Sequence, residues 1–175
     1  IWYGTHPQQQ SQVQTAANVA SSSKTPPPIK LAVGMKAPEF AASTTAGPFD
    51  LAKATKSVFL EVFATWCPHC QRETQVLDKL FALYGKRITF VAVSGSDLGM
   101  DGSKPASQQD VLDFAQRFQV KYPIAYDGQE TVMGLYDQGG YPTMLIIGKD
   151  KTIKYATSGE MAYADLAAQI EKVVK

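Results

Sequence analysis

The sequence Cys67-Pro68-His69-Cys70 constrains this chain most, because it contains both of its cysteines and lies between two regular patterns. A nearly continuous apolar run from Val58 to Phe63 precedes it and predicts a buried strand. Apolar residues at helical spacing follow it as far as Tyr84 and predict a helix. Two thiols three positions apart at a strand-to-helix junction can close a small ring reversibly. The pattern therefore favours dithiol–disulfide exchange.

The order of residues in this motif predicts different roles for its two thiols. Pro68 suits the first helical turn, because its fixed φ fits there and its missing N–H would have had no partner. Cys67 then becomes the helix N-cap, where unpaired N–H groups and the positive end of the helix dipole favour thiolate over thiol. His69 adds a donor or positive charge near that sulfur. We predict Cys67 as the nucleophile and Cys70, one turn further on, as the thiol that resolves a mixed disulfide.

Other uses of the two cysteines compete with exchange. A structural disulfide across so short a loop would stabilise the fold little. A zinc site needs about four ligands, whereas the chain adds only His6 and His69 to its cysteines. A buried inert pair fits badly with Pro-His between the thiols. The alternative function is a metal-delivery module in which Cys67, Cys70 and His69 hold copper or zinc, because thiolates suit Cu(I). No methionine stands beside the motif to support it.

Composition sets the outer limits of the fold. A chain of 175 residues with 45% hydrophobic content can hold one well-cored domain plus an extension. Its net charge of +1 gives no sign of the strongly basic surface that binds nucleic acid. Residues 1–28 are polar, without a sustained period, and are predicted to form a flexible tether before a domain at 29–175. The opening Ile1-Trp2-Tyr3 fits a remnant after a signal peptide, a membrane anchor or an ordinary chain end.

The remaining patterns predict an α/β domain. Glu61 interrupts the strand before the motif, and a buried acid is costly unless it has a role or a partner. The order of strands and helices predicts a mixed central sheet with helices on both faces. The segment from Gly34 to Phe40 is expected to lead into a short strand or hairpin that ends at Gly47-Pro48. The other expected strands lie at 58–63, 88–93, 122–126, 144–147 and 152–156. The expected helices lie at 68–84, from a capping box at Ser107 to Phe118, at 130–136 and at 161–174.

Several of these features together resemble a known superfamily. The motif from Ala64 to Cys70, the acid at Glu61 and Tyr141-Pro142-Thr143 at the head of a late strand are similar to the thioredoxin superfamily. The stretch from Gly34 to Phe40, the turn Phe49-Asp50-Leu51 and Glu73 are more specifically similar to TlpA/ResA-like extracytoplasmic thiol-disulfide oxidoreductases. The resemblance covers residues 34–175 and implies a thioredoxin-like fold with an N-terminal β-hairpin extension.

The resemblance also implies roles for residues outside the two thiols. Pro142 resembles the cis-proline that faces the disulfide and presents neighbouring backbone to a substrate. Glu61 resembles the buried acid that handles the proton of Cys70, and a salt-bridged core carboxylate is the alternative. Trp66 resembles the aromatic residue that precedes the first cysteine and shapes the site. Tyr141 departs from the family, because it is bulkier than the usual residue before the proline, and it is expected to restrict which peptides fit. Plain packing is the alternative for both residues.

The function implied by the resemblance is that of a monomeric thiol-disulfide oxidoreductase in the periplasm or on the exterior of the cell envelope, secreted or tethered through its N-terminus. It would act on protein thiols and disulfides, with a membrane redox partner and no cofactor, metal or nucleic acid. Pro68-His69 is the dipeptide found between the cysteines of oxidising Dsb-type proteins. The features shared with TlpA/ResA-like proteins and Glu61 instead suit a reductant or isomerase. We expect the reduction potential of the Cys67–Cys70 pair to lie between that of thioredoxin, about −270 mV, and that of the Dsb-type oxidant, about −120 mV.

Overall fold

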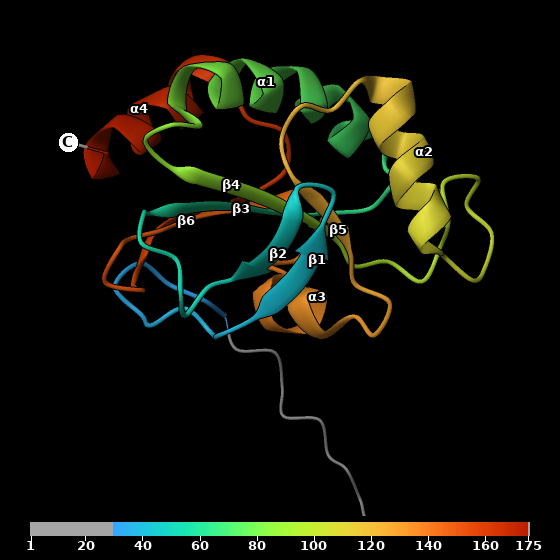
Figure 1. The fold of residues 1–175 in the computed structure, drawn as a ribbon, viewed down its shortest axis with the longest axis horizontal. Coiled ribbons are helices and arrows are strands. Elements are labelled where there is room, and N and C mark those ends of the chain that lie inside the picture. Colours follow the sequence, from blue (N-terminus) through green and yellow to red (C-terminus); the bar gives the residue numbers. More distant parts are fainter. Residues whose placement is uncertain (1–29, 175) are drawn as a thin grey trace, which may run out of the picture.

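A computed structural model describes residues 30–174, so the predicted tether lies outside the described residues. These residues form a seven-stranded sheet with four helices (Figure 1). The elements in chain order are β1 (Ala41–Thr44), β2 (Gly47–Asp50), β3 (Val58–Phe63), α1 (Pro68–Tyr84), β4 (Thr89–Ser94), α2 (Gln108–Phe118), β5 (Ile124–Tyr126), α3 (Thr131–Tyr136), β6 (Thr143–Ile147), β7 (Ile153–Ser158) and α4 (Tyr163–Val173).

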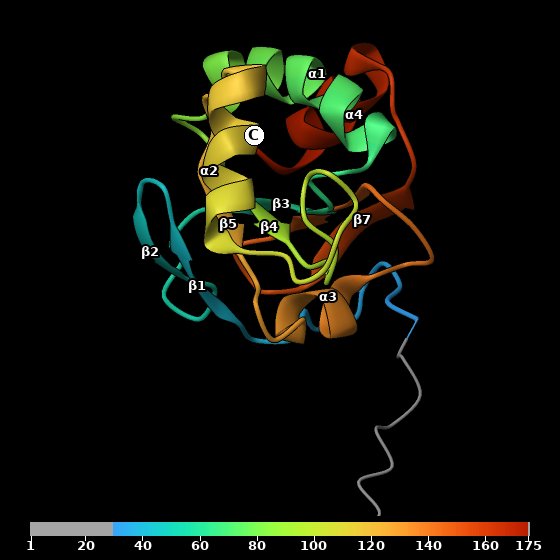
Figure 2. The same cartoon turned by 90° about the vertical axis from the view of Figure 1, so that its right-hand side faces the viewer.

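The sheet is mixed, and its strand order is β2-β1-β5-β4-β3-β6-β7. Strand β3 pairs in parallel with β4 and antiparallel with β6, while β4 pairs in parallel with β5. Helices α1, α2 and α4 cover one face of the sheet, and α3 covers the other (Figures 1 and 2). The prediction of a thioredoxin-like mixed sheet with helices on both faces is confirmed.

All six residues of β3 are buried, as its apolar sequence predicts for a central strand. Side chains alternate between faces along a strand. Phe59 and Phe63 accordingly belong to the core beneath α1 and α4, whereas Leu60 and Val62 belong to the core on the α3 side. Glu61 therefore lies on the same face as Phe59 and Phe63, and the core on that face also contains both cysteines.

The predicted bounds of α1 are confirmed at both ends. Cys67 is its N-cap, with extended backbone, and Pro68 occupies the first helical turn. The helix ends at its C-cap Gly85, whose N–H donates to the carbonyl of Phe81. The predicted capping box at the start of α2 is confirmed as well, with Ser107 and Asp110 bonding reciprocally.

The segment from Gly34 to Phe40 leads into the β1–β2 pair, as predicted, and its one sheet contact is an isolated bridge between Lys36 and Thr152. The N–H groups of Gly34 and Ala37 donate to carbonyls of Ile153 and Lys151 around the β6–β7 turn. Pro38 has no N–H to continue a ladder. The antiparallel pair β1–β2 follows this segment, so Gly47-Pro48 begins β2 and does not end a strand.

Two leucines on α1 give a matched test of this core. Leu80 is fully buried in the core beneath the helix, and Leu83 is 58% exposed. We expect Leu80→Ala to lower the free energy of unfolding by about 2–5 kcal/mol, because it removes buried contacts and leaves a cavity. Leu83→Ala should change it by less than about 0.5 kcal/mol. Urea unfolding of both reduced variants measures the difference, and equal losses would contradict the described packing of α1.

Candidate active site

The two cysteines occupy unequal positions at the start of α1. Both are free thiols. Cys67 is 4% exposed and Cys70 is fully buried one turn further on. The Sγ of Cys67 lies 3.8 Å from the carbonyl oxygen of Tyr141, to which the thiol donates. Only Cys67 therefore retains any contact with solvent.

The surroundings shift the pKa values of the two thiols in opposite directions. The pKa of Cys67 falls to about 6, chiefly because the side chain of Cys70 donates to its sulfur. The backbone N–H groups of Cys70 and His69 and the charge of His69 act in the same direction, against the effect of burial. Burial raises the pKa of Cys70 far above its ordinary value, and the nearby Cys67 and Glu61 add to this. Cys67 is thus the thiol that ionises near neutral pH.

The loop before β6 faces Cys67 because β6 is the antiparallel neighbour of β3. Thr143 at the start of β6 pairs with Val62 near the end of β3, which brings the preceding loop beside the start of α1. The peptide bond between Tyr141 and Pro142 is cis, and Pro142 is buried. The backbone of this loop therefore stands opposite the sulfur of Cys67.

Two aromatic rings border the thiols, and both are held by the loop that follows β4. The Nε1 of Trp66 donates to the Oγ of Ser96 at 2.7 Å, and the hydroxyl of Tyr141 donates to the carbonyl of Gly95 at 2.7 Å. The rings meet edge to face with centroids 6.2 Å apart. Burial raises the pKa of Tyr141 to about 12, so its hydroxyl stays protonated as a donor. No local pattern indicated Gly95 and Ser96 as anchors of these rings.

Glu61 is buried beneath the thiols, with 1% of its surface exposed. The hydroxyl of Tyr122 donates to its Oε2 at 3.4 Å, whereas its Oε1 has no hydrogen-bond partner among the described residues. No salt bridge within residues 30–174 includes Glu61. Burial raises the pKa of Glu61 well above its ordinary value, and the charge of Glu73 adds to the shift. A carboxyl with a raised pKa can exchange a proton near neutral pH.

A second buried carboxyl, Glu73, belongs to the same site, although the sequence analysis used it only as a mark of resemblance. It is 2% exposed, its Oε2 accepts from the N–H of Met161 at 3.2 Å, and its Oε1 has no partner among the described residues. Burial raises its pKa to about 7. Its position three residues after Cys70, on the same helix face, was the signal available in the sequence.

Pro68 and His69 separate the thiols on the exposed side of α1. The Nδ1 of His69 lies 2.5 Å from the Oε1 of Glu160 and 2.9 Å from the Nη2 of Arg72. Glu160 comes from the loop between β7 and α4. Sequence reasoning missed Arg72 and Glu160, because nothing local to the motif indicates a partner 91 positions away.

Comparison with known proteins places this site in a family. The Redoxin family model matches residues 32–170. The chain belongs to the redoxin family. Over 146 residues this redoxin is 30% identical to the thiol-disulfide oxidoreductase ResA of Geobacillus thermodenitrificans, covering 82% of this chain and 79% of ResA. It is therefore a TlpA/ResA-like member of the thioredoxin superfamily and a thiol-disulfide oxidoreductase.

Solved structures share the fold of this redoxin. A Chlorobium tepidum protein provisionally assigned as the thiol:disulfide interchange protein DsbE superimposes with a TM-score of 0.72 at 23% identity, covering 83% of this chain and 99% of that one. A secreted disulfide oxidoreductase of Mycobacterium tuberculosis gives a TM-score of 0.62 at 20% identity, covering 76% of this chain and 95% of that one.

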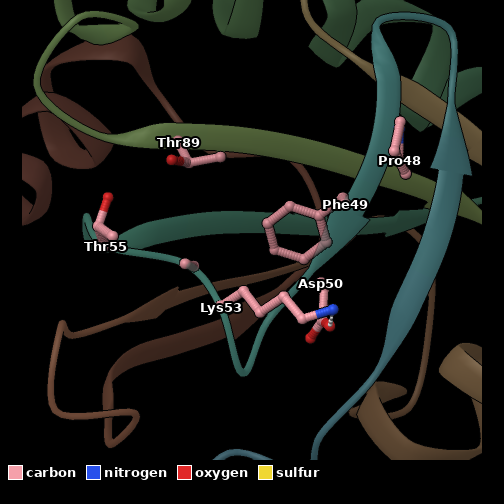
Figure 3. A pocket seen from close by; sticks show the side chains of 7 residues that line it. Pro48, Phe49, Asp50, Lys53, Thr55 and Thr89 are labelled. Carbon is pink, nitrogen blue, oxygen red and sulfur yellow. Dashed lines mark ion pairs between the residues drawn. The ribbon is translucent and has the colours of Figure 1, made fainter.

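Other features of the described residues lie apart from the thiols. The hollow in Figure 3 is lined by residues around β2 and the β2–β3 loop, including Phe49 and Lys53, and by Thr89. Thr89 starts β4, whereas Gly95 and Ser96 of the site follow its other end. Among residues 30–174, no group of three or more His, Cys, Asp or Glu side chains could hold a metal ion. Within the same range, no helix has the length and apolar character needed to cross a membrane.

The lowered pKa of Cys67 predicts a thiolate titration that depends on Cys70. In the reduced redoxin, ultraviolet thiolate absorbance should rise with a midpoint at about pH 6, and the rate of attack by Cys67 should fall as the pH drops below it. Cys67→Ser should abolish this rise in thiolate absorbance. Cys70→Ala should move the midpoint of this rise to higher pH, because the contact that most stabilises the Cys67 thiolate is lost. A wild-type midpoint near the ~8.5 of a free thiol would contradict the described site.

Proposed function

We propose that this redoxin exchanges disulfides with protein substrates, with Cys67 as the attacking thiol and Cys70 as the resolving thiol. The observation that carries the proposal is the arrangement at the start of α1. The N-cap sulfur of Cys67 faces the backbone of the cis Tyr141-Pro142 peptide, and Cys70 is wholly buried behind it. A substrate can therefore reach one sulfur and not the other.

The reaction in the reducing direction has two steps. The Cys67 thiolate attacks a sulfur of the substrate disulfide, that S–S bond breaks, and a mixed disulfide forms on Cys67. The other substrate sulfur leaves as a thiolate and takes a proton from water. Cys70 then loses its proton and attacks the Sγ of Cys67, which releases the second substrate thiol. The substrate gains two electrons and two protons, and the protein retains a Cys67–Cys70 disulfide. Oxidation of a substrate dithiol follows the same steps in reverse.

Glu61 is proposed to take up and return the proton of Cys70. The Cys70 thiol is hard to ionise where it is buried, so the second step needs an acceptor for its proton. Glu61 shares the same core and influences the pKa of Cys70. Its own raised pKa lets the carboxyl hold a proton at a pH where an exposed glutamate would be charged.

The substrate surface is proposed to comprise Pro142 with the aromatic rings of Trp66 and Tyr141. The carbonyl of Tyr141 lies 3.8 Å from the Sγ of Cys67, so an extended substrate segment bound to Cys67 could pair with the backbone of this loop. The rings are fixed by hydrogen bonds to Ser96 and Gly95, so they offer apolar contact area at little cost in side-chain entropy. Pro68 and His69 border the same sulfur and tune its ionisation.

The setting is proposed to be extracytoplasmic, in the periplasm or on the cell-envelope exterior. Support comes from the TlpA/ResA-like relationship and from the secreted Mycobacterium tuberculosis oxidoreductase with the same fold. In this proposal residues 1–28 tether a monomeric domain, beginning at 29, to the membrane. A membrane redox partner would keep the dithiol in the state that the substrates require.

Single-cysteine variants test the order of attack. With insulin as a disulfide substrate, reduced Cys70→Ser should accumulate a mixed disulfide, because Cys67 can attack and nothing resolves the adduct. Cys67→Ser should form almost none and should reduce insulin no faster than a buffer control. Non-reducing gel electrophoresis with mass spectrometry identifies the adduct. Equal adduct from both variants, or wild-type activity in Cys67→Ser, would rule out the proposed roles.

Glu61→Gln tests proton handling with an uncharged side chain of the same size. We expect the mixed disulfide to form at a near-normal rate but to decay about 10²-fold more slowly, because the acceptor for the Cys70 proton is lost. Tyr122→Phe is the matched control, since it removes the hydrogen bond to Glu61 and keeps the carboxyl. Rapid-quench time courses separate the two steps, and equal slowing of both would indicate a structural role for Glu61.

A further inference from the structure

Three titratable side chains meet on the surface beside the thiols and form what we call the outer cluster, comprising His69, Arg72 and Glu160. His69 and Arg72 lie on the first turns of α1. The Nε of Arg72 donates to both oxygens of Glu160, at 3.1 and 3.2 Å, and its Nη2 forms a further bond to Oε1. The same Oε1 lies 2.5 Å from the Nδ1 of His69. One carboxylate thus contacts the side chains of both Arg72 and His69.

The backbone on each side of Glu160 is fixed to the thiol site. The N–H of Gly159 donates to the carbonyl of Pro142 at 2.8 Å, and the N–H of Met161 donates to the Oε2 of Glu73 at 3.2 Å. Gly159 has a φ of +90°, which glycine adopts without strain. Because the loop is anchored at both neighbours, little conformational entropy is lost in holding the carboxylate against its partners.

The outer cluster lies within electrostatic range of Cys67. The charge of His69 helps to lower the pKa of Cys67, and the pKa of Arg72 is raised chiefly by Glu160 and further by Cys67. The field of Glu160 also reaches the buried part of the site, since it adds to the raised pKa of Glu73. A negative charge at this position therefore opposes ionisation of acidic groups around the thiols.

We propose that Glu160 is a positioning residue that sets the thiol–disulfide equilibrium of Cys67 and Cys70 from outside their motif. Its carboxylate holds His69 and Arg72 in place and offsets their positive charge, which limits how strongly they stabilise the Cys67 thiolate. This inference rests on the proposed role of Cys67 as the ionising thiol. Removing the charge of Glu160 stabilises that thiolate and so favours the reduced protein.

Equilibration with glutathione tests the inference with Glu160→Gln. Two glutathione thiols are oxidised to glutathione disulfide as the protein disulfide is reduced to two thiols, so electrons and protons balance. We expect Glu160→Gln to shift this equilibrium about threefold toward the dithiol. A change of this size matches the free energy that an exposed ion pair typically contributes. That shift equals about 14 mV for a two-electron couple. The pKa of Cys67 should fall by about 0.5 in the same variant, and Arg72→Gln should shift the equilibrium the opposite way.

The pair Arg87–Glu171 supplies a matched control, because it joins the other end of α1 to α4 with a separation of 3.4 Å. Glu171→Gln makes the same change of charge and should leave the equilibrium unchanged. The shift in Glu160→Gln should vanish in 1 M salt, which screens exposed charges. It should be smaller in a background lacking both His69 and Arg72. An equal shift in Glu171→Gln, no shift in Glu160→Gln, or one that persists in salt overturns the inference. Failure of the wild type to equilibrate with glutathione would instead overturn the proposed function.

Discussion

The position of one sulfur, at the junction where buried β3 becomes α1, is the constraint on which the rest of the site depends. Strand β3 is paired on both sides and buried throughout, so the residues that leave its end have little freedom. Pro68 starts the helix at once, which leaves Cys67 as its N-cap facing the N–H groups of His69 and Cys70. Because β6 is the antiparallel neighbour of β3, the Tyr141-Pro142 peptide is carried to the same point. Fold and reactivity are therefore set by the same strand pairings.

This arrangement includes two carboxyls that a core built for stability alone would not contain. Glu61 and Glu73 are both buried, and each has one oxygen without a partner among the described residues. Leaving a buried polar atom unpaired costs about 1–3 kcal/mol. Their raised pKa values reduce that cost, because the neutral form is easier to bury than the charged one. The same shift makes them suited to proton exchange, so the destabilising feature and the proposed chemistry share one cause.

Features that depend on local sequence could be predicted, and features that depend on distant partners could not. The bounds of β3 and α1 follow from apolar patterning and a proline, and the capping box at Ser107 follows from four adjacent residues. The bound predicted for the hairpin was wrong, because Gly47-Pro48 begins β2. The bonds from the N–H groups of Gly34 and Ala37 to the β6–β7 turn could not be predicted, because their partners lie far along the chain. The anchor of Trp66 on Ser96 depends on a contact between residues 30 positions apart. Such pairings arise only once the sheet is assembled.

The thiol site is consequently surrounded by two layers of charge and hydrogen bonding that respond differently to solvent. The inner layer consists of Cys70 and backbone N–H groups, which are shielded from water and from salt, and it accounts for most of the lowered pKa of Cys67. The outer layer is exposed, and salt screens its contribution. His69 belongs to that outer layer and is already engaged by Glu160. The dipeptide between the cysteines therefore does not by itself describe the surroundings of Cys67, because its imidazole is held by a loop 91 positions away.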